Sequence, residues 1–166
     1  MATTFDWGEG LPTIQGREVH LRPLGDEDAP AMLSIFGDPE VMKFWSSPPL
    51  RDLAAAVKLI GEIRAGFEGR SLFQWGVSSR EGVEAIGTCT LFNVDLAHRR
   101  AEVGFALRRD YWGQGLATDA LGSLIEFSFK TLALHRLEAD VDPNNERSQR
   151  VLERQGFRRE GYLRER

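Results

Sequence analysis

Two groups of residues in this sequence have types and spacings that suit chemistry, and the first is a glycine turn at Gly113-Gln114-Gly115. The turn follows an apolar run of strand character and leads into a segment with helical periodicity from Leu116. This order collects free backbone N–H groups and the positive end of a helix dipole at one point, where glycine allows close approach of a ligand. The turn therefore indicates an anion site suited to phosphate. A plain strand–helix turn is an equally good interpretation of this short motif alone.

The second group begins at Asn145-Glu146-Arg147-Ser148 and continues through Arg150-Val151-Leu152-Glu153 to Gly156-Phe157. Asn145 suits the N-cap of a helix, and Ser148 lies in the first turn of that helix. Gly156 stands where a helix ends in the left-handed conformation. Helix capping alone could explain each of these residues, so the function of the group has to be inferred together with the rest of the chain.

Hydrophobic periodicity predicts the elements that position these two groups. Residues 1–15 form a polar arm without periodicity, and the first half of the chain after this arm ends in an antiparallel three-strand meander. The second half is predicted to be a crossover unit with two parallel strands, 135–141 and 157–163. We predict strands at 17–24, 71–78, 84–92, 100–107, 135–141 and 157–163, and helices at 26–37, 50–67, 116–132 and 146–155. The whole chain, 1–166, is expected to be one domain of mixed α/β (α+β) class.

Composition excludes several classes of function. The net charge of −4 provides no general attraction to nucleic acid or to a membrane surface. No apolar run is long enough to span a bilayer, and the N-terminus lacks the layout of a signal peptide, so we expect a cytoplasmic protein. The only cysteine, Cys89, lies in an apolar strand and is expected to be a buried structural thiol. The three histidines have no metal-ligand spacing, so we expect no metal site.

In this order of elements, the glycine turn and the later N-x-x-S-x-R-V-L-E-x-x-G-F segment resemble the GNAT N-acetyltransferases. The resemblance is strongest to the branch of the RimJ and RimL ribosomal-protein N-terminal acetyltransferases, and it extends from Arg17 to Arg164. It implies the GNAT fold, with an antiparallel N-terminal meander, a splayed pair of parallel strands and flanking helices. It also implies acetyl-CoA as co-substrate and a primary amine as acceptor, which attacks directly in a ternary complex.

The resemblance implies a cofactor site in three parts. The pyrophosphate loop falls on residues 110–115, where Asp110 and Trp112 depart from the usual pattern. The strand before it bulges and pairs with the pantetheine arm by strand addition, and Asn145 hydrogen-bonds the same arm. The residues implied are Phe105, Ala106, Leu107, Trp112, Gly113, Gln114, Gly115, Leu116, Ala117, Thr118 and Asn145. Three arginines are additional candidates for the phosphates, or are simply solvated: Arg108, Arg109 and Arg150.

The resemblance also implies catalytic roles. Many members carry a tyrosine that acts as general acid at the position of Leu152, whereas this branch uses the serine at the position of Ser148 for that role. Ser148 would protonate or hydrogen-bond the leaving thiolate, or it only supports the helix cap. Glu102 is the candidate general base; a strand-edge carboxylate and a water chain are the alternatives. Four aromatic residues are assigned to the acceptor pocket or to the core: Phe44, Trp45, Phe73 and Trp75.

Two other functions compete with this hypothesis. A catalytically idle acyl-CoA-binding module is suggested by the missing tyrosine and by the end of the chain at Arg166, where members of the branch continue with a further strand. That strand is expected to be missing or to be supplied by a neighbouring chain, which makes a homodimer possible. A dinucleotide-binding enzyme fits poorly, because Thr118 occupies the place of a third small apolar residue and a meander precedes the loop.

Overall fold

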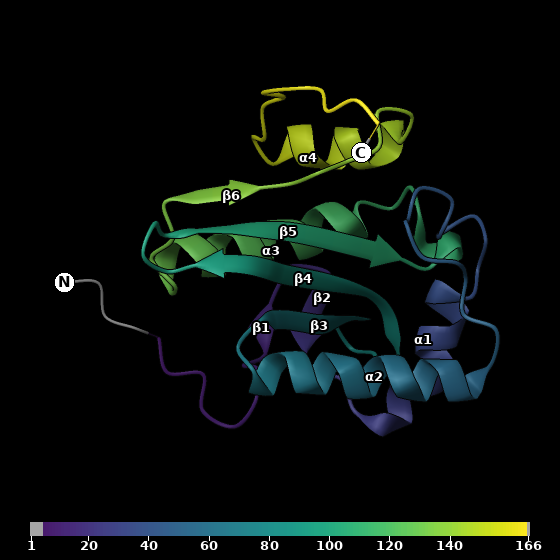
Figure 1. Cartoon of the computed structure of the whole chain (residues 1–166). Helices are drawn as coiled ribbons and strands as arrows, with labels where there is room; N and C mark the ends of the chain where they lie inside the picture. Colours follow the sequence, from purple (N-terminus) through teal and green to yellow (C-terminus); the bar gives the residue numbers. More distant parts are fainter. Residues whose placement is uncertain (1–4, 166) are drawn as a thin grey trace.

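A mixed six-stranded sheet forms the centre of the molecule in the computed structural model, which describes residues 5–165 (Figure 1). The strands follow one another in space in the same order as in the sequence. They are β1 (Ile14–Gln15), β2 (Val19–Arg22), β3 (Leu72–Ser79), β4 (Ala85–Asp95), β5 (Arg100–Leu107) and β6 (Arg136–Glu138). The first five pair antiparallel, which confirms the expected meander, and the parallel pair is formed by β5 and β6.

Helices cover both faces of this sheet (Figure 1). On one face lie α1 (Ala29–Phe36), preceded by the short turn η1 (Asp26–Asp28), and α2 (Leu53–Glu68). On the other lies α3 (Leu116–Lys130), which follows the short turn η2 (Arg109–Tyr111) and packs beside α4 (Glu146–Arg154). Because strand side chains alternate between faces, the sheet has two cores, one centred on Trp75 and Leu121 and one on Met32 and Ile60.

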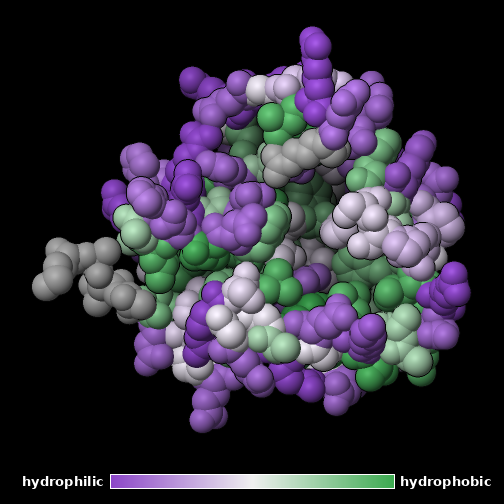
Figure 2. All heavy atoms as spheres, viewed as in Figure 1, coloured by the Kyte–Doolittle hydropathy of each residue, from purple (hydrophilic) through white to green (hydrophobic). Residues whose placement is uncertain are grey.

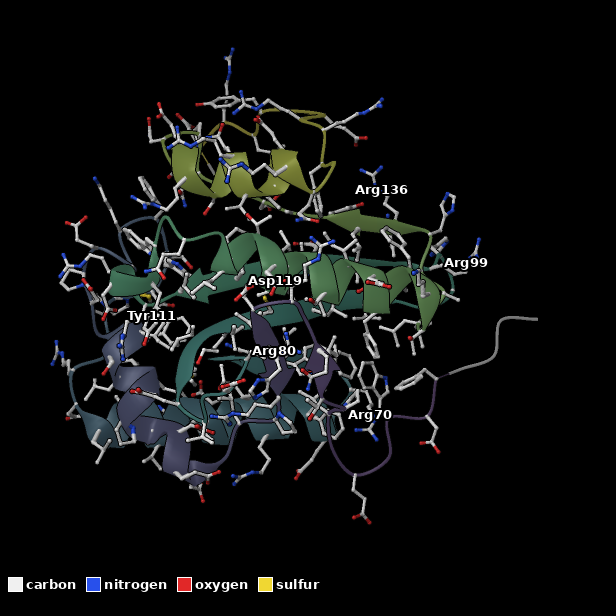
Figure 3. All side chains as sticks on the ribbon, turned by 180° about the vertical axis from the view of Figure 1, so that it is seen from behind. Arg70, Arg80, Arg99, Tyr111, Asp119 and Arg136 are labelled. Carbon is white, nitrogen blue, oxygen red and sulfur yellow. The ribbon has the colours of Figure 1, made fainter. Side chains whose placement is uncertain are left out.

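Asp119 joins the glycine-turn helix to the start of the sheet. Its carboxylate, in the first turn of α3, accepts the N–H groups of Arg17, Glu18 and Val19 at 3.1, 2.8 and 3.1 Å. A carboxylate is favoured at this end of a helix by the dipole. Figure 3 shows the side chain leaving α3 toward the first strands. The orientation of α3, and hence of the glycine turn before it, is therefore tied to β2.

The parallel pair is joined over only part of its length. Its register runs from Arg100 opposite Arg136 to Glu102 opposite Glu138, so residues 103–107 of β5 have no strand beside them on that side. The two chains diverge from Glu102 into a V, whose mouth lies between the end of β5 and the start of α4 (Figure 1). In the space-filling view a hollow with apolar side chains inside it opens over this divergence (Figure 2). The splayed pair expected from the resemblance is confirmed.

The predicted strand at 157–163 is wrong, and with it the parallel pairing of that segment to 135–141. Residues 157–163 have no strand structure, and most of their side chains are exposed. Glu160 in this segment forms an ion pair of 2.6 Å with Arg136 of β6. The apolar residues that suggested a strand, Tyr162 and Leu163, are 65% and 59% exposed, so no burial holds them in a sheet.

The arm at 1–15 is more ordered than its lack of periodicity predicted. Ile14 and Gln15 form β1 against β2, and the Trp7 ring stacks on Phe73 with centroids 4.2 Å apart. The remaining part of that prediction, residues 1–4, lies outside the described residues. In the described chain, no helix has the length and apolar character needed to cross a membrane.

Candidate functional site

The glycine turn has the geometry of an anion site. Gly113 and Gly115 have φ angles of +77° and +78°, and a Cβ at either position would meet no protein atom within 4 Å. Gly115 is the N-cap of α3, so the N–H groups of Leu116, Ala117 and Thr118 lack partners within the helix. The residues of the turn are exposed. The turn therefore combines a left-handed backbone, open space and unpaired donors at one helix end.

The two unusual residues of the loop brace it. The Trp112 indole N–H donates to the Leu107 carbonyl at 2.7 Å, and Asp110 pairs with Arg108 at 2.7 Å. Arg108 donates hydrogen bonds to the Asp110 carboxylate, and these bonds raise the pKa of Arg108 and lower the pKa of Asp110. The Gln114 side chain donates to the Asp110 carbonyl at 3.3 Å. The loop is therefore held by its own side chains, which leaves its backbone donors free for a ligand.

One edge of β5 is open to an added chain. The Arg108 N–H donates to the Ile86 carbonyl, and the β4–β5 register is regular from Gly87 to Phe92. Because backbone groups of an antiparallel pair alternate in direction, the even-numbered residues of β5 bond β4 and the odd-numbered residues point into the V. An extended ligand in the V would therefore meet the backbone of Val103 and Phe105, whereas the backbone groups of Ala106 face β4. Sequence reasoning missed Val103, which only the strand register identifies.

The bulge that the resemblance implied at 105–107 is not found. The β4–β5 register shifts instead between Phe92 and Asp95, at the other end of the pair. The strands separate at Glu102 because β6 ends at Glu138, and no irregularity in β5 is needed to open the V.

The first turn of α4 brings Asn145 and Ser148 together on the opposite side of the V. The Asn145 Oδ1 accepts the Ser148 N–H at 3.2 Å, so the cap uses the carbonyl oxygen of the side chain and the backbone of the serine. Ser148 is half-buried, and among residues 5–165 its hydroxyl makes no hydrogen bond. Leu152, the position at which the resemblance implied a tyrosine in other members, is buried in the core. The serine hydroxyl is therefore available to a ligand.

Glu102 marks the apex of the V. It shares a sheet face with Ala106, which packs against α1 and α2, so its carboxylate lies on the side of those helices. The Asn93 side-chain amide donates to Glu102 at 3.0 Å, and Asn93 has a left-handed backbone (φ 47°) within the register shift. A small hollow surrounds this pair and is lined by Asn93, Asp95, Arg100, Ala101, Glu102 and Glu138. Asp95 already pairs with Arg100, and Glu138 pairs with Arg136. Glu102 has no ion pair among the described residues, so it is the carboxylate of this hollow that could receive a cationic group.

The arginines near the loop differ from the expectation. Arg108 is paired with Asp110 and with Glu84, and Arg109 is paired with Asp38 at 3.1 Å. Arg150 is exposed, and none of the described carboxylates forms an ion pair with it. A further arginine, Arg147, also contacts the loop, and its guanidinium lies 3.9 Å from the centroid of the Trp112 ring. Sequence reasoning missed this contact, because it joins residues from two elements.

The aromatic candidates for the acceptor pocket divide into two pairs. Phe73 and Trp75 are buried core residues, and the Trp75 indole N–H donates to the Pro12 carbonyl at 2.8 Å. Trp45 is 44% exposed with its edge on Phe36, and Phe44 is half-buried. The core interpretation therefore holds for the first pair.

Cys89 is fully buried, as expected, and burial raises the pKa of its thiol to about 12. No metal-binding group of side chains occurs among the described residues.

Comparisons with known proteins agree with this geometry. Residues 18–158 match a protein family described as acetyltransferase (GNAT) domain. The chain is 35% identical over 156 residues to the uncharacterized N-acetyltransferase p20 of Bacillus licheniformis, covering 93% of this chain and 87% of that protein. It is 31% identical to the spermidine N(1)-acetyltransferase of Escherichia coli, covering 87% and 75%. The solved structure of Mycobacterium smegmatis RimJ in complex with CoA-disulfide superimposes with a TM-score of 0.81, at 28% identity, covering 90% and 77%.

Proposed function

Because this chain belongs to the GNAT family of acetyltransferases, we propose that it transfers an acetyl group from acetyl-CoA to a primary amine in a ternary complex. The observation that carries the proposal is the V, where three features meet. These are the unpaired helix start at Gly115, the open edge of β5 and the free hydroxyl of Ser148. Relatives and solved neighbours that act on amines or hold CoA support the same reading.

The residues of the V fit acyl-CoA. The glycine turn leaves room for a diphosphate where any Cβ would intrude, and the N–H groups of residues 116–118 would bind it. The backbone of Val103 and Phe105 would pair with the amides of the pantetheine arm in the manner of an added strand. The Asn145 amide NH2, which makes no hydrogen bond with any residue from 5 to 165, is available to the same arm. When bound, acetyl-CoA supplies the acetyl thioester.

Two side chains would handle the protons. A new bond would form between the amine nitrogen and the acetyl carbon, the carbon–sulfur bond would break, and an acceptor that binds protonated would lose two protons in becoming an amide. Glu102, directly or through a water, would accept the first proton before attack. The second would reach the departing sulfur through the Ser148 hydroxyl, which would donate its own proton to the sulfur and regain one from the nitrogen. The α4 dipole supports this second role, because the positive end of the helix stabilises charge that develops on sulfur near Ser148. The acid and the base would therefore act from opposite sides of the V.

The acceptor proposed is an amine that is protonated before it binds. The Glu102 carboxylate at the apex forms no ion pair with the described residues and would favour a cation there. A small-molecule amine and a protein N-terminus both meet this requirement, and the names of the relatives include an acetyltransferase of spermidine and one of a ribosomal protein.

The homodimer also stays a proposal, which light scattering on the purified protein would test.

A catalytically idle acyl-CoA-binding module is the alternative, and the buried Leu152 in place of a tyrosine favours it. Release of free CoA thiol distinguishes the two functions, and Cys89 is too deeply buried to react in such an assay. The protein would be incubated with acetyl-CoA and a panel of amines that includes spermidine, amino acids and peptides with free N-termini. An enzyme releases thiol in step with acetylated amine, whereas binding of CoA without turnover on any amine would overturn the proposal.

A further inference from the structure

We propose that Arg147 binds a phosphate group of acyl-CoA, with the Trp112 ring as its platform. The inference deepens the proposed function, because it rests on the same cofactor site. It assigns a ligand contact to a residue of α4 that neither the glycine turn nor the helix cap explains. A phosphate bound by Arg147 would lie at the mouth of the V, between the first turn of α4 and the loop before α3.

The position of Arg147 is unfavourable unless an anion is present. It is the second residue of α4, so its positive charge lies at the positive end of the helix dipole. Among the residues that the structure describes, no carboxylate forms an ion pair with it. The neighbouring Glu146 is exposed and does not pair with it either. The arginines of the loop differ, because Arg108 and Arg109 both have carboxylate partners.

Two helix starts lie close together at this point. Arg147 contacts Trp112, and Trp112 precedes the N-cap of α3, Gly115, by only two intervening residues. The starts of α3 and α4 therefore contribute positive potential to the same region, in addition to the guanidinium. Asp110, the carboxylate within the loop, is occupied by Arg108. A negatively charged ligand would balance this concentration of positive charge.

The platform is rigid and leaves the donors of the arginine free. The Trp112 ring is fixed by the 2.7 Å hydrogen bond from its N–H to the Leu107 carbonyl, and the Arg147 guanidinium lies over it at 3.9 Å. A guanidinium that stacks on an aromatic ring keeps its N–H groups directed sideways, where they can bind two phosphate oxygens at once. The stack also holds the long side chain in place before the ligand arrives, which reduces the entropy lost on binding.

The first experiment measures CoA affinity by calorimetry, independently of acetyl transfer. We expect Arg147→Ala to weaken binding about tenfold, the usual effect of losing a hydrogen bond to a charged group. Arg147→Lys keeps the charge without the flat stacking surface and should lie between Arg147→Ala and the wild type. The matched control is Arg154→Ala, which removes the same charge from the last turn of α4, where the residue is exposed. Equal losses in Arg147→Ala and Arg154→Ala would overturn the proposal.

The second experiment identifies the ligand group. Dephospho-CoA lacks the 3′-phosphate, and S-acetylpantetheine lacks every phosphate. NMR titration can follow weak binding of the latter. A phosphate contact predicts that Arg147→Ala and the wild type bind S-acetylpantetheine equally. If Arg147 binds the diphosphate, Arg147→Ala should lose the same affinity for CoA and for dephospho-CoA. If Arg147 binds the 3′-phosphate, the loss of affinity should occur with CoA alone. A full defect with S-acetylpantetheine would show that Arg147 only shapes the V, and would overturn the proposal.

The platform has a test of its own. Trp112→Leu should weaken CoA binding, and adding Arg147→Ala to it should cost less than Arg147→Ala costs alone, because the two side chains act together. Additive losses would refute the role of Trp112. Circular dichroism of each variant shows whether it is folded. If the wild-type protein itself failed to bind CoA, the proposed function would fail first, so the two failures are distinguishable.

Discussion

At the scale of single residues, the proposed chemistry rests on two side chains, one from β5 and one from α4. Ser148 comes from the first turn of α4, and Glu102 comes from the last position of β5 that is paired with β6. Each has an alternative structural role, as part of a helix cap or as a strand-edge carboxylate. The contacts around each residue make these alternatives testable.

We predict that Ser148→Ala lowers turnover by roughly tenfold to a thousandfold, the range for losing one proton donor or oxyanion-type donor. CoA affinity and stability should change little, because the bond to Asn145 uses the Ser148 backbone N–H and survives the substitution. Steady-state kinetics, calorimetry and thermal unfolding measure these three quantities. The control is Ser34→Ala on the surface of α1. Unchanged turnover in Ser148→Ala, with chemistry rate-limiting, would leave the residue only a structural role.

For Glu102→Gln we predict a loss of rate that depends on pH. The substitution keeps the shape and the contact with Asn93 but removes the proton acceptor, so the loss should be largest below the pKa of the acceptor amine. Raising the pH should recover part of it, because more acceptor arrives already neutral. Parallel pH–rate profiles test this, with Glu126→Gln on the surface of α3 as control. Superimposable profiles for Glu102→Gln and wild type would exclude Glu102 as the base.

At the scale of elements, the glycine turn combines the start of a helix with the proposed anion site. Gly115 starts α3 from the left-handed region, and its missing side chain leaves the front of the helix open. Asp119 then anchors the same helix turn to β2. The position of the anion site therefore depends on an element boundary, and two different substitutions at Gly115 can separate the backbone effect from the steric one.

We predict that Gly115→Val weakens CoA binding at least tenfold, or about 1.4 kcal/mol, and also destabilises the fold, because a branched residue is strained at φ +78°. Gly115→Asn tolerates the left-handed backbone and should remain near wild-type stability. Its side chain still points where the phosphate would lie, so it should share the loss of affinity. Calorimetry and urea unfolding separate the two effects. Wild-type affinity in a folded Gly115→Val protein would contradict the loop assignment.

At the scale of the whole molecule, an ion pair between half-buried Arg22 and buried Asp28 also holds a turn that is distant in sequence. Arg22 on β2 donates to Asp28 before α1 at 2.7 Å and to the Val83 carbonyl in the β3–β4 turn. Burial acts to raise the pKa of Asp28, but hydrogen bonds from Arg22 and from the Gly25 N–H outweigh it and lower the pKa below its ordinary value. The pair therefore links the sheet to the helices on one of its faces.

The pH dependence follows from the lowered pKa of Asp28. A carboxylate whose pKa is lower in the folded state adds stability above its unfolded pKa, near 4, and loses it as the pH falls through the folded pKa. We predict that Asp28→Asn costs about 3 kcal/mol of unfolding free energy at neutral pH and progressively less in acid. Urea unfolding at several pH values measures this, with the exposed pair member Asp26→Asn as control. A difference that does not depend on pH would contradict the prediction.

The sequence alone determined much of this protein, because many of its signals are local. Gly113 and Gly115 indicated a left-handed turn before a helix, and Asn145 indicated a helix cap. Hydrophobic patterning located the antiparallel strands β2 to β5 but missed the short β1. These features depend on neighbours within a few residues, where conformational preference and hydrogen bonding decide the structure. The family resemblance rested on the same two local motifs and was confirmed.

The tertiary structure alone decided which residues from separate elements meet. The length of the β5–β6 pairing, which ends at Glu102, determines where the V opens, and the strand register directs the Val103 backbone into it. Arg147 meets Trp112 across that opening, although nothing near either residue in the sequence signals the contact. The segment 157–163 shows the converse, because its pattern suited a strand, but only Phe157 packs against the core while Tyr162 and Leu163 remain exposed. Pairing and burial depend on residues far away in the chain, so a local pattern cannot specify them.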